Sequence, residues 1–76
     1  MTNEQLNHYE ALTKLVDSQY EAVLAKTMQL AGMSIGEGES SSSYVTRVND
    51  KIDDINVAKM WLEQAKENKR AFVMQI

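Results

Sequence analysis

Apolar residues recur every three or four positions from residue 6 to residue 31, which is the spacing of one face of an α-helix. No glycine or proline interrupts this stretch before Gly32, and glycine commonly ends a helix in the left-handed conformation. Thr2 and Gln5 fit a capping box, and Asn3 is an equally good cap. The pattern predicts a helix over residues 3–31 with a buried stripe formed by Leu6, Tyr9, Leu12, Val16, Tyr20, Val23, Thr27 and Leu30.

A second pattern of the same period occupies the C-terminal half and predicts a helix over about residues 44–70. Thr46 fits the position of its cap, because Asn49 and Asp50 would then place polar and negative groups in the first turn. Ser43 is the competing start. The buried stripe of this helix is predicted to consist of Val48, Ile52, Ile55, Ala58, Leu62 and Ala65.

The second helix carries more apolar surface than one facing helix would cover. Val57, Met60 and Trp61 lie beside its stripe, and excess width of this kind suggests a second contact surface. Tryptophan is enriched among the central residues of interfaces, although at this position it would also serve to cover the core of the hairpin. The candidate partner-interface residues are Val57, Met60, Trp61, Phe72, Met74 and Ile76.

The last six residues are apolar except for Gln75 and allow two interpretations. Phe72 and Ile76 extend the stripe of the second helix if the tail is helical. Phe72, Met74 and Ile76 instead share one face if the tail is a short strand that adds to the edge of a partner's sheet. We expect the helix to extend to about residue 70 and the tail to be packed or docked.

Residues 32–43 separate the two patterns and hold all three glycines of the chain and a run of four serines. This composition predicts a flexible Gly/Ser-rich loop. A minimal β-hairpin within residues 33–46, with 33–35 pairing with 44–46, is the structured alternative. The glycines lack the remainder of a phosphate-binding frame. We therefore predict an all-α fold in which residues 1–76 form a single domain, an antiparallel two-helix hairpin.

Size and charge narrow the classes of partner. A chain of 76 residues without cysteine has a small core and no disulfide to support it, so we expect it to form a homo-oligomer or to dock on another protein. Eleven acidic against eight basic residues give a net charge of −3, which disfavours binding to nucleic acids and to anionic membranes. The N-terminus does not resemble a signal peptide. We expect a cytoplasmic protein.

The residues offer little for catalysis or for metal binding. The chain has one histidine and no cysteine, and no nucleophile, base and acid are spaced to converge. Asp50, Asp53 and Asp54 could suggest a metal site, but their helical spacing predicts a solvated charged face neutralised in part by Arg47 and Lys51. We expect no enzymatic activity, no cofactor, no metal and no small-molecule substrate.

Several short motifs occur in a recognisable order, namely Met33–Gly36, Val45-Thr46-Arg47, the pair Ile52 and Ile55, and Trp61-Leu62-Glu63. Over about residues 20–65 this order resembles small head–tail joining, or neck, proteins of tailed bacteriophages. The resemblance implies a short strand at Ser34–Gly36, a helix start at Thr46, and a non-enzymatic virion component bound to a portal, connector or tail ring. Such a protein would be found in the host cytoplasm or in the virion.

The function expected from the sequence is therefore that of a protein–protein interaction module. Its most concrete form is a bacteriophage structural or head–tail joining protein. A small regulator or inhibitor that binds a host or viral protein through the apolar face of its second helix is the alternative.

Overall fold

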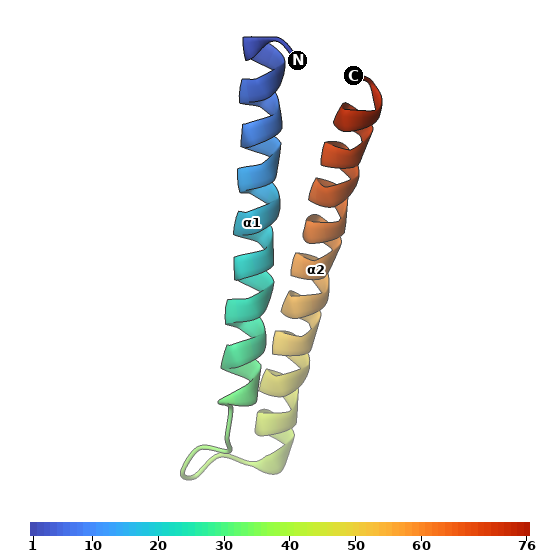
Figure 1. Cartoon of the computed structure of the whole chain (residues 1–76). Helices are drawn as coiled ribbons and strands as arrows, with labels where there is room; N and C mark the ends of the chain where they lie inside the picture. The colour runs from blue at the N-terminus through green and yellow to red at the C-terminus, as the bar shows by residue number, and fades with distance from the viewer.

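The computed structural model describes residues 1–76 and contains two helices, α1 (Asn3–Ala31) and α2 (Ser41–Met74), joined by residues 32–40. The helices lie side by side and run antiparallel, so both termini are at one end of the molecule and the connecting loop is at the other (Figure 1). The molecule is a rod with extents of 60 × 15 × 13 Å. The predicted all-α two-helix hairpin is confirmed.

Helix α1 begins and ends where the sequence pattern placed it. The Thr2 hydroxyl accepts a hydrogen bond from the Gln5 amide at 3.1 Å, and the Gln5 side chain accepts one from the Thr2 amide at 2.8 Å. This is the predicted capping box. The left-handed conformation predicted for Gly32 is wrong, because its φ is −89°; its amide donates to the carbonyl of Met28, and the amide of Met33 donates to that of Leu30. The positive φ occurs later, at Gly38.

Helix α2 is longer at both ends than predicted. It starts at Ser41 because the Ser40 hydroxyl accepts a hydrogen bond from the Ser43 amide at 3.1 Å, so Ser40 is the cap in place of Ser43 or Thr46. The Thr46 hydroxyl instead donates to a carbonyl one turn back. The helix continues to Met74, since no glycine or proline stops it after residue 70. A strand at Phe72–Ile76 is therefore excluded.

The connecting loop is organised around the carboxylate of Glu39. Arg47 donates to both of its oxygens at 2.7 Å, and the Gly36 amide donates to it at 2.9 Å. Arg47 also reaches the Ser34 carbonyl at 3.0 Å. The hydrogen bonds from Arg47 and from Gly36 lower the pKa of Glu39 to about 2. No β-hairpin forms, because residues 44–46 belong to α2; three of the four serines lie in that helix and not in the loop.

The surface between the helices follows a strict alternation of four and three residues, the spacing of an antiparallel coiled coil. Its members are the buried and half-buried residues at these positions, which we call the seam. On α1 and the residues just after it, the seam comprises Gln5, Tyr9, Leu12, Val16, Gln19, Val23, Lys26, Leu30 and Met33. On α2 it comprises Tyr44, Val48, Lys51, Ile55, Ala58, Leu62, Ala65, Lys69 and Phe72.

The seam differs from the predicted stripes at four positions. Leu6, Tyr20, Thr27 and Ile52 were expected to be buried and are exposed; the Tyr20 side chain is 58 % exposed. The residue immediately before each of them, a glutamine or a lysine, takes the seam position instead. Glutamine and lysine can lie there because their apolar stems pack while their polar ends reach solvent or a partner.

The core of the hairpin is small. Only Ile55, Ala58, Leu62 and Ala65 are buried, all of them predicted, and no residue of α1 is. Fifteen large hydrophobic side chains are exposed. Neither helix has a stretch that is both long and apolar enough to cross a membrane. The hairpin therefore leaves most of its apolar side chains without a partner inside the molecule.

Candidate functional site

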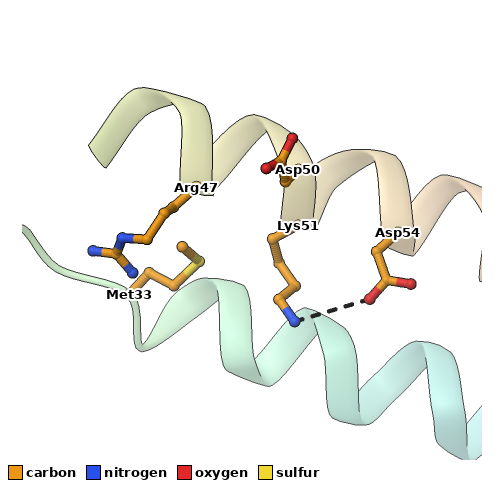
Figure 2. Close-up of a pocket in the computed structure, with 5 residues that line it drawn as sticks. All are labelled: Met33, Arg47, Asp50, Lys51 and Asp54. Atoms are coloured by element: carbon orange, nitrogen blue, oxygen red, sulfur yellow. Dashed lines mark ion pairs between the residues drawn. The ribbon is translucent and has the colours of Figure 1, made fainter. Parts of the chain in front are cut away.

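One candidate site is a polar groove near the loop end, lined by Met33, Arg47, Asp50, Lys51 and Asp54 (Figure 2). Lys51 and Asp54 extend from α2 toward α1, whereas Asp50 points away from it (Figure 2). Arg47 is paired with Glu39 of the loop. Both cationic side chains of the groove therefore already have acceptors within the protein.

Asp54 joins the two helices at this groove. Its carboxylate accepts a hydrogen bond from Lys26 Nζ of α1 at 2.7 Å and lies 3.9 Å from Lys51 Nζ on its own helix. Lys51 also donates to the side-chain oxygen of Gln29 at 3.0 Å. The hydrogen bond from Lys26, aided by the charges of both lysines, lowers the pKa of Asp54. We infer that this network of charged side chains fixes the register of the two helices.

The acidic residues of this region do not converge on one point. Asp54 is engaged with lysines, and Asp53 and Asp50 form no ion pair. The protein contains no group of three or more histidine, cysteine or acidic side chains arranged to hold a metal ion. The groove consists of charges that neutralise one another, which suits a structural role.

The second candidate is the side of the hairpin that carries Trp61. Its residues each precede a seam residue by one position, so helical geometry places them on one side of the seam. Trp61 and Leu15 line the same groove, which shows that the two helices contribute to one surface. We call this surface the Trp61 face and define it as Ala11, Leu15, Ser18, Ala22 and Ala25 of α1 with Val57, Trp61, Gln64, Asn68 and Ala71 of α2.

The ten residues of the Trp61 face include no acidic or basic residue, whereas the same two rows carry Glu4, Arg47, Asp50 and Asp54 beyond them. The two shallow grooves that flank Trp61 are lined only by uncharged side chains. Each of the other three grooves has at least three charged residues in its lining. Depletion of charge together with an exposed aromatic residue is the composition found at the centre of protein interfaces.

The opposite side of the seam has a different character. Its residues each follow a seam residue by one position, and we call it the Tyr20 face. It exposes the large hydrophobic side chains of Leu6, Tyr20, Leu24, Val45, Ile52 and Val73. Charged residues interrupt these side chains along both helices, namely Glu10, Asp17, Lys59, Glu63, Lys66 and Arg70.

The six interface candidates predicted from the sequence do not all lie on one surface of the structure. Val57, Met60 and Trp61 cluster around one groove and are exposed, and Trp61 is 62 % exposed. Phe72 is half-buried, with its ring centroid 4.5 Å from that of His8, so it belongs to the seam. The remaining two candidates, near the C-terminus, are exposed at the end of the hairpin opposite the loop (Figure 1).

Sequence reasoning missed the contribution of α1 to this face. Leu15 and the small residues Ala11, Ser18, Ala22 and Ala25 form an uncharged row with the same spacing of four and three. That spacing was visible in the sequence. It could be recognised only with the correct seam, because each of these residues is defined by the seam residue that follows it.

The features implied by the resemblance to neck proteins are absent at the loop. Ser34–Gly36 is not a strand, and the second helix starts before Thr46. No protein-family model matches the chain, and comparisons with curated proteins and with solved structures likewise found no match.

Proposed function

We propose that this chain is a non-enzymatic protein–protein interaction module whose uncharged apolar surface is covered by a protein partner. The observation that carries the proposal is the imbalance between four buried residues and fifteen exposed large hydrophobic ones. Exposed apolar side chains in this number, with Val57, Met60 and Trp61 gathered around one uncharged groove, are typical of a surface that binds a partner.

The shape of the molecule supports the same proposal. A compact monomer of 8.6 kDa would expose about 4,700 Å², whereas this hairpin exposes 5743 Å². Its radius of gyration is 17.8 Å, against about 11 Å for a compact domain of this length. The excess surface of about 1,000 Å² is comparable to one side of a standard interface.

In its most concrete form, the module is a small bacteriophage structural or head–tail joining protein. The order of the sequence motifs at Met33–Gly36, Thr46-Arg47 and Trp61-Leu62 is the basis of this form, and the strand and the helix start at Thr46 that they imply do not form in the hairpin. We expect the gene for this chain to lie beside terminase, portal or tail genes. A gene that stands alone in a cellular genome would contradict the phage form. It would not contradict the proposal that the chain is an interaction module.

A regulator that binds a host or viral protein through α2 is the second candidate. It is favoured by the position of Val57, Met60 and Trp61, which all lie on α2 around one uncharged groove. Such a regulator would need only one helix of the hairpin for binding. Substitutions on α1 would then leave its affinity unchanged.

Site-specific photo-crosslinking in the native cell tests the proposal. A photoreactive phenylalanine analogue at Met60, beside the uncharged groove, should give a discrete protein adduct. The same analogue at Asn56, an exposed polar position on the Tyr20 face, is the control and should give none. Absence of any adduct at Met60, or equal labelling from both positions, would contradict the proposal.

A further inference from the structure

We propose that the occupant of the Trp61 face is a second copy of this chain, so that two hairpins form a four-helix bundle with Trp61 near its centre. This inference rests on the proposed interaction function and adds the identity of the partner. The two-fold axis runs along the hairpins and places α2 of each copy on α1 of the other.

The excess surface of the whole hairpin suits a dimer. A standard interface removes about 800 Å² of surface from each partner, and the hairpin exposes about 1,000 Å² more than a compact monomer of its mass. The uncharged rows run through residues 11–25, in the middle of α1, and residues 57–71, in the C-terminal half of α2. Acidic and basic side chains surround them, as expected for the rim of an interface.

The face is complementary to itself. Its largest side chain, Trp61, belongs to α2 together with Val57, and four of its five α1 residues are alanine or serine, with Leu15 as the exception. Pairing α2 with α1 of the other copy sets large residues against small ones in both halves of the interface. Pairing like helices would set small against small and large against large, and the two pairs of helices would then need different separations.

The level of Trp61 along the rod gives its expected site. The contacts Lys26–Asp54, Gln29–Lys51 and His8–Phe72 fix which residues of α1 and α2 lie at one height, and at this register Trp61 lies beside Gln19. An axis parallel to the rod preserves this height, so Trp61 of one copy meets α1 of the other around Gln19, between Ser18 and Ala22. Every neighbouring pair of helices in this bundle is antiparallel, which also aligns the helix dipoles favourably.

Sedimentation equilibrium of the intact chain is the first test, from about 1 µM to about 500 µM, a range that spans weak and moderate dimers. The expected result is a mass that rises to twice that of the chain. A mass of one chain at every concentration would overturn the inference.

Paired variants then test the face. Trp61→Ala should raise the dimer dissociation constant by at least about 30-fold, as for a central aromatic residue. Tyr20→Ala removes an aromatic residue of similar exposure from the opposite face, so it should change that constant by less than about threefold. Equal effects of the two substitutions would contradict the assignment of the face.

A second pair of variants does not depend on Trp61. Ser18→Glu places a charge on the α1 row of the face and should prevent dimerisation, because that carboxylate would lose its water. Asn56→Glu adds the same charge at an exposed position outside the face and should leave the dimer intact. Circular dichroism at the same concentrations reports whether each chain is helical. A helical dimer of the Ser18→Glu chain would overturn the proposed packing.

The outcome at Met60 separates this inference from the proposed function. An adduct of twice the chain mass supports both. An adduct with a different protein, together with a monomeric mass in sedimentation, would overturn the second copy as partner and retain the interaction function. A monomer without any adduct would contradict both.

Discussion

The middle of the hairpin and its loop end are held together by different means. In the middle, Ile55 and Leu62 are buried with two alanines, and the helices are joined by apolar packing. At the loop end, Asp54 links two lysines and Glu39 links the loop to Arg47. Apolar packing is strong and nearly insensitive to register, whereas a paired charge is weaker and specific for its position. The comparison indicates that the middle supplies stability and the loop end fixes the alignment.

The largest expected effect is that of a cavity in the middle. Leu62→Ala should lower the free energy of unfolding by about 2–4 kcal/mol, because Leu62 is only 7 % exposed. The matched control is Leu24→Ala, at a leucine that is 48 % exposed on the Tyr20 face. Chemical denaturation of both variants measures the difference, and a cost at Leu24 equal to that at Leu62 would contradict the position of the core.

The next effect is expected at the network of Asp54. Asp54→Asn leaves Lys26 and Lys51 without their shared carboxylate, so the melting temperature should fall, by less than for Leu62→Ala. Added salt should reduce the difference from the unmodified chain, because these side chains are partly exposed. Asp53→Asn, next to it and without an ion pair, should melt like the unmodified chain. An equal fall in both variants would mean that net charge and not the network is responsible.

A smaller effect is expected in the loop. Gly38 has a φ of 74°, and Gly38→Ala should cost about 1 kcal/mol of stability, since an L side chain rarely adopts that conformation. No atom lies within 4 Å of the added Cβ, so the cost would come from the backbone alone. Gly36→Ala, at a glycine without a positive φ, should be nearly neutral by the same denaturation measurement.

The smallest effect is a dependence on pH at Glu39. Its pKa is about 2 in the folded chain and 4.5 as the ordinary value, so its ionised form favours folding. This stabilisation is complete above pH 4.5 and is lost as the pH falls toward 2. Thermal melts across that range should show the loss, and Glu39→Gln should show a smaller dependence. An unchanged pH profile in the variant would contradict the role of Glu39 in holding the loop.

The helices were predictable because α1 has a strong cap and neither pattern contains an internal glycine or proline. The seam was predicted correctly in the middle of α2, where all four members are apolar, and at the apolar seam positions Tyr9, Leu12, Val16, Val23, Leu30 and Val48. At other positions the seam residue is Gln19, Lys26 or Lys51, and the residue after it is more apolar. A prediction from hydrophobicity alone therefore assigned the wrong residue to the seam. Extending the spacing of four and three residues from Ile55 and Ala65 in both directions would have located the seam along the whole of α2.

The loop and the interaction surface were harder to predict. The serines were assigned to the loop by composition, but Ser40 is a helix cap and the three that follow are the first turn. Glu39 pairs with a residue on the next helix, and such a contact depends on the fold. Trp61 was identified from its residue type. The uncharged row on α1 could be seen only after the seam was known.

The central claim is that the hairpin is completed by a second copy covering the Trp61 face. Thermal unfolding followed by circular dichroism at increasing protein concentration tests it most directly. For a dimer of this size, a hundredfold increase in concentration should raise the melting temperature by about 8 °C, and Trp61→Ala should abolish most of that rise. A melting temperature that is independent of concentration in the unmodified chain would contradict the claim.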